Sequence, residues 1–450
     1  MKRCTTLVYS PVHQCRYAGE GCGCARCVCV PVNQGSSLAR HSRYRSHRMC
    51  IGHTCARQRP LFQPSNRSVC RSSVMNTVSV MFRAKHLIAA LAIVLLPASS
   101  VFAQSTTSDA PAAPTAMSTP AMTGPLTANP NPMSVDTGVF GTWYVTGAVT
   151  GLALSQDNRI PGDRSNQTDL GNGQVFIQKT SGQLQFFVQA GGYSLPALGA
   201  GYLSANETTS GFYGMVPQAF VKYVPNDHFS LMAGKMPTLI GAEYSFTFEN
   251  MNIERGLLWN QENAVNRGVM ATYVQGPITA SLSVNDGFYS HRYNWVVGSL
   301  AYTIDKNNSL SFIAGGNTSQ TTRSSLAVPL LQNNSQIFNV IYTHLAGPWT
   351  ITPYLQYTRV PTNTDLGIVH AASTTGVALL ANYAFNASFS LASRAEYISS
   401  TGSVANGAPS LLYGPGSKAW SLTFTPTYQN KLLFVRAEIS YVKASSTTPG

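Results

Sequence analysis

From Gly141 to the end of the chain, apolar and polar residues alternate over short stretches. Residues 419–429 are a clear example. The apolar positions are Trp420, Leu422, Phe424 and Tyr428. The polar positions between and beside them are Ser421, Thr423, Thr425, Thr427 and Gln429. Because successive side chains of a β-strand point to opposite faces of a sheet, this period of two predicts strands with one apolar face. Fifteen strands are predicted, at 141–154, 173–179, 183–192, 216–224, 228–236, 266–275, 277–287, 294–304, 309–316, 335–345, 349–359, 372–385, 388–399, 419–429 and 431–443.

The connections between these strands alternate between short and long. The short ones consist of turn-forming residues, such as Ser181-Gly182 and Pro225-Asn226-Asp227. The long ones lie at 155–172, 193–215, 237–265, 288–293, 317–334, 360–371 and 400–418. Short turns on one rim and long loops on the other are typical of a transmembrane β-barrel. The predicted fold class is therefore all-β, as an antiparallel up-and-down barrel that spans a membrane.

The composition of the polar face distinguishes this barrel from a water-soluble one. A soluble barrel packs its apolar face inside and carries many charged residues outside. Here the polar face is mostly Ser, Thr, Gln and Asn, and only 10% of the chain is charged. Aromatic residues such as Tyr223, Phe229, Trp349 and Tyr428 lie beside the short turns, as in an interfacial girdle. A water-filled lumen surrounded by outer-membrane lipid accounts for both features.

Fifteen is an odd number, whereas bacterial single-chain barrels have an even number of strands. We therefore expect sixteen strands, with the last one missing from this chain because residue 450 is a truncation point. Fourteen is the alternative count, because 173–179 is the weakest of the strand candidates.

The first 103 residues differ from the rest and account for the basic composition. All nine cysteines precede residue 75, whereas residues 104–450 contain sixteen Lys and Arg and sixteen Asp and Glu. After Met75, two basic residues, an apolar run and a small residue at Ala103 predict a signal peptide over 75–103. The balanced charge after it gives no reason to expect a nucleic-acid partner.

The segments around the signal peptide have different interpretations. Residues 1–74 are interpreted as a disordered upstream extension that is not part of the translated protein, because a signal peptide belongs at the start of a chain. Their Cys and His residues match no tetrahedral zinc spacing, so no metal site is predicted. Residues 104–138 are rich in Pro, Ala, Ser and Thr and predict a flexible periplasmic linker. The barrel is expected over 139–450.

Three stretches carry a resemblance to a known family: GAEYSFTFENMNIERGLLWNQENAVNRG from Gly241, GKMPTLIGAE from Gly234 and NDGFYSHRYNWVVGSLAYTID from Asn285. In these stretches the chain resembles the OmpL-like β-barrel porins, the second β-barrel porin family, over about Gly141 to the end. The resemblance implies a diffusion channel in the outer membrane of Gram-negative bacteria, with a substrate that the motifs do not fix.

Loop 237–265 is the third long loop and is too long for an ordinary hairpin connection, so a function is expected of it. By resemblance to general porins, it would fold into the lumen and narrow the pore. Its charged residues are Glu243, Glu249, Glu254, Glu262 and Arg255. A charged constriction selects solutes by size and by field. The alternative is a solvated surface loop.

Strand parity places a second set of charges on the lumen wall. Because Arg and Lys cost roughly 2–4 kcal/mol when they face lipid at the bilayer midplane, we expect these side chains to point inward. They are Lys222, Arg394, Glu396, Arg436 and Glu438. They would either tune conductance or pair with one another and brace the wall.

The sequence thus predicts an outer-membrane porin for passive diffusion of small hydrophilic solutes or ions, with no cofactor. A plugged structural or adhesive barrel is the alternative, followed by an outer-membrane hydrolase that uses Asp286, Ser290 and His291. A homotrimer is one option for its assembly, although the strand pattern singles out no interface.

Overall fold

The computed structural model describes residues 122, 124–160 and 162–448, which belong to one compact unit of the chain, Gln104–Gly450. The expected extension 1–74 and signal peptide 75–103 lie outside the described residues, as does most of the expected linker 104–138. These three interpretations stay predictions.

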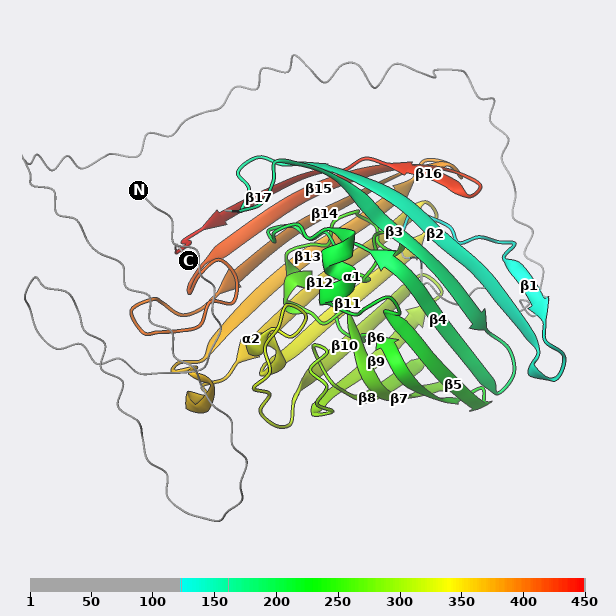
Figure 1. The fold of residues 1–450 in the computed structure, drawn as a ribbon, viewed down its shortest axis with the longest axis horizontal. Coiled ribbons are helices and arrows are strands. Elements are labelled where there is room, and N and C mark those ends of the chain that lie inside the picture. The colour runs from blue at the N-terminus through cyan, green and yellow to red at the C-terminus, as the bar shows by residue number, and fades with distance from the viewer. Residues whose placement is uncertain (1–121, 123, 161, 449–450) are drawn as a thin grey trace, which may run out of the picture. The chain divides into compact units, whose positions relative to one another are not determined.

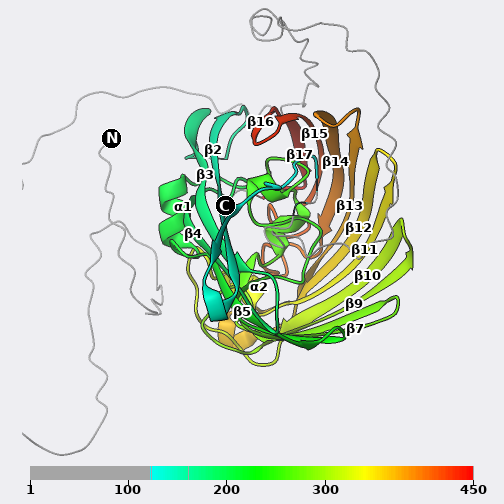
Figure 2. The same ribbon diagram turned by 90° about the vertical axis from the view of Figure 1, so that its right-hand side faces the viewer.

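The strands form one antiparallel sheet that curls around a central space (Figures 1 and 2). They are β1 Met133–Asp136, β2 Thr142–Ser155, β3 Asn166–Lys179, β4 Leu184–Tyr193, β5 Gln218–Asn226, β6 Phe229–Pro237, β7 Val265–Gln275, β8 Ile278–Asn285, β9 Trp295–Asp305, β10 Asn308–Asn317, β11 Gln336–Ala346, β12 Trp349–Val360, β13 Ala372–Ala384, β14 Phe389–Ser400, β15 Lys418–Asn430, β16 Leu433–Arg436 and β17 Ile439–Ser445.

The helices are short and lie in the connections. They are α1 Ala205–Gly211, α2 Leu330–Asn333 and four 3-10 turns at Gly138–Phe140, Thr247–Glu249, Leu258–Gln261 and Thr364–Leu366. Within the described ranges, no helix combines the length and the hydropathy that a membrane crossing requires.

All fifteen predicted strands are present, so the predicted antiparallel up-and-down barrel is confirmed. The predicted strand 431–443 is divided into β16 and β17. The division lies opposite Pro426 of β15, which has no backbone N–H to give to the ladder at this point. The additional strand β1 pairs with the beginning of β2.

The predicted strand 173–179 is the second half of the longer strand β3. The first half, NQTDLGNG, is polar and rich in Gly, so it shows no alternation. A shift in register between Thr150 and Gly151 of β2 further disturbs the pattern there. The alternative count of fourteen strands is therefore wrong, while the sixteenth strand stays a prediction.

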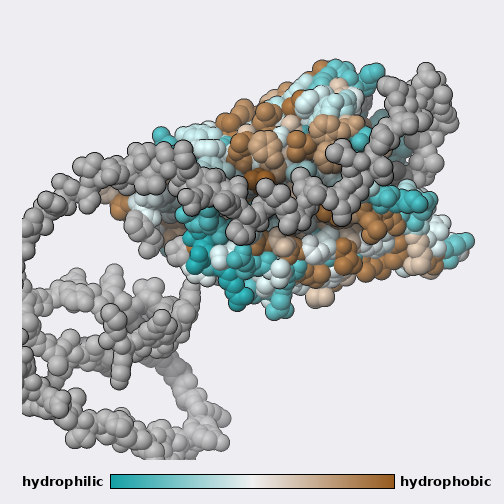
Figure 3. All heavy atoms as spheres, turned by 90° about the horizontal axis from the view of Figure 1, so that it is seen from above, coloured by the Kyte–Doolittle hydropathy of each residue, from teal (hydrophilic) through white to brown (hydrophobic). Residues whose placement is uncertain are grey.

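The two faces of the sheet differ as predicted, and apolar residues gather over the strands on the face seen in Figure 3. Aromatic residues beside the short turns are cross-strand neighbours on the outer face: Phe229 with Tyr273, Trp349 with Tyr383, and Phe389 with Tyr428. The inner face of β15 carries buried hydroxyl groups instead, on Ser421, Thr423 and Thr425. This arrangement is the one expected of a barrel with a polar lumen.

The described part of the expected linker packs against the barrel. Leu126 is buried in a cluster that includes Phe176 and Phe248. The backbone of Thr127 exchanges two hydrogen bonds with the side chain of Gln429, at 2.9 and 3.2 Å. The chain therefore reaches the barrel wall before the boundary expected at residue 139.

Candidate functional site: the loop inside the barrel

The connection between β6 and β7 lies within the ring of strands, where Figure 2 shows it as the green segment inside the barrel. We call residues 237–265 the inner loop. Apolar side chains anchor it to several parts of the wall. Phe246 packs edge-to-face on Tyr193 of β4, with ring centroids 5.3 Å apart. Leu258 packs with residues of β12 to β15, and Ile240 with residues of β9 to β11.

Each of these anchors is nearly inaccessible to water. Complete burial of a large apolar side chain contributes roughly 1.5–3 kcal/mol, so the three anchors oppose release of the inner loop into solvent.

Arg394 of β14 forms the centre of a buried ionic network that joins the inner loop to the wall. Its Nη1 atom lies 2.6 Å from Glu243 Oε1 and donates to the carbonyl of Glu254 at 2.8 Å. Its Nε atom lies 3.2 Å from Glu396 Oε2 on the same strand. Glu396 in turn accepts hydrogen bonds from the backbone N–H groups of Leu257 and Leu258. Arg394 therefore holds the inner loop at Glu243 and Glu254, and Glu396 holds it at the backbone of Leu257 and Leu258.

Arg436 and Glu438 form a second attachment of the same kind. Arg436 donates to the backbone carbonyls of Thr247, Asn250 and Met251. Glu438 accepts from the backbone N–H groups of two consecutive loop residues, Ile253 at 2.5 Å and Glu254 at 3.1 Å.

Neutral polar residues attach the inner loop to other parts of the wall. Asn172 of β3 donates a side-chain hydrogen bond from Nδ2 to Thr247 Oγ1 at 2.6 Å. Asn252 donates in the same way from Nδ2 to Thr425 Oγ1 of β15 at 2.7 Å. Tyr354 and Gln356 of β12 bind the Glu262 carboxyl and the Leu258 carbonyl, respectively. The inner loop is thus held by β3, β12, β14 and β15 together.

These neutral contacts were missed at the sequence level, because a single Asn, Gln or Thr on the lumen face looks like ordinary lumen lining. The position of Tyr354 could have indicated a contact with the inner loop. It is an aromatic residue on the face of its strand that otherwise carries Thr352, Gln356 and Thr358.

Arg255 lies in the inner loop, but none of the described hydrogen bonds or ion pairs joins its side chain to the charged wall residues. Its backbone pairs with the preceding long loop, through Pro196 and Leu198. The guanidinium is fully buried, has no hydrogen-bond partner among the described residues, and lies 5.3 Å from the centroid of the Trp259 ring. Burial lowers the pKa of Arg255 to about 10, so it is still a cation at neutral pH.

Burial also shifts the pKa of three further carboxyl groups of the inner loop, those of Glu249, Glu254 and Glu262. Burial raises the pKa of Glu249 and of Glu262 to about 8. Burial, with Glu438 nearby, raises the pKa of Glu254 to about 7. Glu249 and Glu262 are therefore mostly protonated at neutral pH, and Glu254 is about half protonated. Burial raises the pKa of Glu243 too, although the neighbouring Arg394 opposes this shift.

Lys222 lies apart from this network. It occupies a lumen-facing position on β5, opposite Met232 of β6. It has no ion-pair partner in the part of the chain that the structure describes. Of the five predicted wall residues, four are thus assembled against the inner loop and Lys222 is not.

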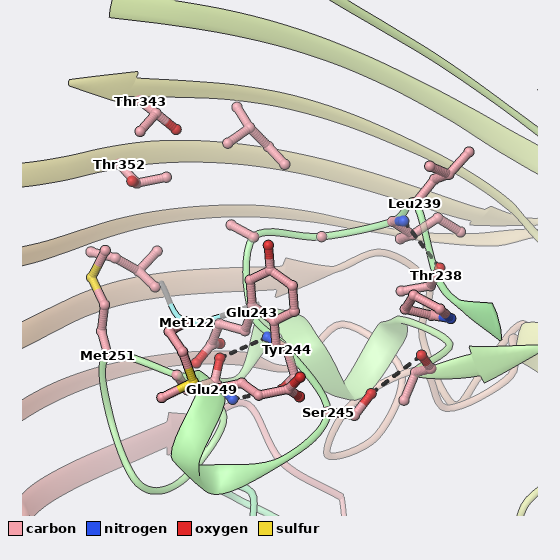
Figure 4. Close-up of a pocket in the computed structure, with 18 of the residues that line it drawn as sticks. Met122, Thr238, Leu239, Glu243, Tyr244, Ser245, Glu249, Met251, Thr343 and Thr352 are labelled. Atoms are coloured by element: carbon pink, nitrogen blue, oxygen red, sulfur yellow. Dashed lines mark hydrogen bonds between the residues drawn. The ribbon is translucent and has the colours of Figure 1, made fainter. Parts of the chain in front are cut away.

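A cavity of about 470 Å³ remains between the inner loop and the wall formed by β11 to β13. Figure 4 shows the loop residues Thr238, Leu239 and Glu243 on one side of it, with Thr343 and Thr352 of the wall on the other. The cavity is therefore bounded by carboxyl, hydroxyl and apolar groups.

The residues considered for a hydrolase are not arranged as a catalytic relay. The carboxylate of Asp286 is paired with Arg267, at 2.7 Å. The Ser290 hydroxyl donates to the carbonyl of Asp286 rather than to the ring of His291.

Replacing Arg394 tests the ionic attachment. Arg394→Gln leaves Glu243 and Glu396 buried without their cation, which should destabilise the folded barrel by roughly 3–5 kcal/mol. The measurement is the temperature at which the barrel loses its folded mobility on a gel. The same change at the exposed Arg359 of β12 is the control and should have little effect. Equal stability of the two variants would contradict the assignment.

Stability should also depend on pH through Glu249. Its folded-state pKa of about 8 lies above the ordinary value of 4.5, so the folded state binds the proton more tightly than the unfolded state. This contribution is fully present below pH 4.5 and is lost as the pH rises through 8. The unfolding temperature should therefore fall between pH 6 and pH 9, and fall less in Glu249→Gln. An identical fall in both proteins would count against a buried, protonated Glu249.

Among solved structures, two outer-membrane proteins show similarity to this chain. The chain is similar to OmpT, an outer-membrane protein of Vibrio cholerae, with 14% identity over 67% of this chain and 87% of that one, at a TM-score of 0.44. It is also similar to the outer-membrane channel DcaP of Acinetobacter baumannii, with 9% identity over 67% of this chain and 91% of that one, at a TM-score of 0.43. No curated protein matches the chain.

A family model described as "Putative beta-barrel porin-2, OmpL-like" matches residues 142–450. This range contains every strand from β2 to β17, the inner loop and the charged wall residues. The chain therefore belongs to the family of OmpL-like β-barrel porins.

Proposed function

We propose that this outer-membrane porin passes small hydrophilic solutes by passive diffusion, and that the inner loop sets the width of its pore. One observation carries the proposal. The inner loop is bonded to strands on several sides of the lumen, and yet a cavity of about 470 Å³ remains beside it. A loop held in this way narrows a channel to a fixed size, which is how pores select by diameter and lining.

The charged wall residues would act mainly as braces. Arg394, Glu396, Arg436 and Glu438 are all engaged with the inner loop, so their charges are used to hold it. Ion preference would then depend on groups without such partners, of which Lys222 is the clearest. Of the two roles that the sequence left open for these wall residues, bracing is then the main one.

The proposal also covers catalysis and the oligomeric state. We expect the channel to carry out no catalytic step, since the carboxylate of Asp286 and the hydroxyl of Ser290 are engaged in other contacts. A homotrimer stays one option for the assembly because porins often associate, and cross-linking in membranes would measure it.

Single-channel conductance in a planar bilayer tests the pore. Thr343 lines the cavity on the lumen face of β11, and Thr343→Trp should roughly halve the conductance because the indole group occupies much of this space. Its neighbour Tyr342 lies on the opposite face of the strand, so Tyr342→Trp is the matched control and should leave conductance unchanged.

Two outcomes would contradict the proposal. A folded wild-type barrel that gives no conductance steps would favour a plugged structural or adhesive barrel. Equal effects of the two Trp variants would show that solutes follow a route away from this cavity.

A further inference from the structure

Two basic residues lie on the outer face of the barrel, unlike the charges of the lumen wall. Lys235 of β6 and Arg267 of β7 are direct cross-strand partners. Along their strands they share a face with the outward-pointing Ala233 and Val269. Both are two residues from the ends of their strands at the long-loop rim. A basic side chain on the lipid face costs far less near an interface than at the bilayer midplane.

Hydrogen bonds with the described residues use only part of the donor capacity of both side chains. Lys235 Nζ donates to the carbonyls of Tyr213 at 3.2 Å and Val216 at 2.7 Å, and an ammonium group has three donors. Arg267 binds the Asp286 carboxylate through Nε and Nη2. Its Nη1 atom makes none of the hydrogen bonds found in the described chain. Donors thus remain on both residues, next to each other.

The strands β5 to β8 lie next to one another in the sheet (Figure 1). On them, an apolar groove of about 700 Å³ runs beside these two cationic groups. Its apolar lining consists of Val216, Ala219, Val269 and Val284, with the exposed ring of Tyr293 at its edge. The groove therefore combines an apolar floor with a pair of cations.

The surrounding charges are mainly positive. Arg267, Arg323 and Lys235 all act on His291, whose pKa is lowered first by burial and then by these cations, while Asp286 opposes them. Among these four groups, the one carboxylate is paired with Arg267, so a net positive charge remains.

We propose that Lys235 and Arg267 bind the phosphate headgroup of a membrane lipid, and that an acyl chain of the same lipid lies in the groove. The charge of the site is complementary to phosphate, whose oxygens would accept the remaining donors in charge-assisted hydrogen bonds. The apolar floor would accommodate a hydrocarbon chain, which a soluble anion does not have. The site lies outside the lumen and is independent of the pore.

Native mass spectrometry of the folded barrel in detergent tests this site with three probes. They are phosphatidic acid, diacylglycerol with the same acyl chains, and inorganic phosphate. Phosphatidic acid should bind at least about ten-fold more tightly than diacylglycerol, because a hydrogen bond to a charged group is lost with the phosphate. Lys235→Gln should weaken the binding of phosphatidic acid by a similar factor.

Two further variants serve as controls. Lys306→Gln removes the same charge in the exposed turn between β9 and β10, at the opposite rim, and should bind phosphatidic acid as the wild type does. If Lys235→Gln does not fold, the double variant Arg267→Gln with Asp286→Asn removes the guanidinium together with its buried partner, and should also bind weakly.

The proposal would be overturned by equal binding of phosphatidic acid and diacylglycerol, or by equal loss in Lys306→Gln and Lys235→Gln. It would also be overturned if inorganic phosphate alone displaced the lipid completely, since the site would then be one for a free anion.

Discussion

Lipid offers no hydrogen-bond partners, and this constraint decides where the polar groups of the chain lie. Each spanning strand forms its backbone hydrogen bonds with neighbouring strands and points its apolar side chains outward. Charges such as Arg394 and Glu396 must then face the lumen. There they are still too buried to be left alone, because an unpaired buried charge is strongly destabilising. The inner loop supplies their partners.

The contacts that pair the buried charges of the wall also position the inner loop. Arg436 and Glu438 bind its backbone carbonyls and N–H groups directly, so the attachment does not depend on the side chains of the loop alone. Apolar anchors such as Phe246 add burial at other points. Stability and pore geometry are thus consequences of one arrangement, and a change to either is expected to affect the other.

The sequence predicted the barrel well, because alternation in strands such as 419–429 is imposed separately on every strand by lipid and water. It failed where local pattern is weak, as in the polar first half of β3. It also identified Arg394 and Glu396 as wall residues by parity, but left open whether they face ions or brace the structure. That distinction depends on contacts between residues such as Glu243 and Arg394, more than a hundred positions apart, which no local pattern records.

Both the stability and the pore geometry depend on the inner loop lying across the lumen, against β15. Asn252 and Thr425 bond to each other there, and residues 104–450 contain no cysteine that could interfere. The direct measurement is cross-linking of the double variant Asn252→Cys with Thr425→Cys in folded barrels by a short thiol reagent, with each single variant as control. We expect an efficient cross-link in the double variant alone. Two thiols that react separately but never join would show that the loop lies elsewhere.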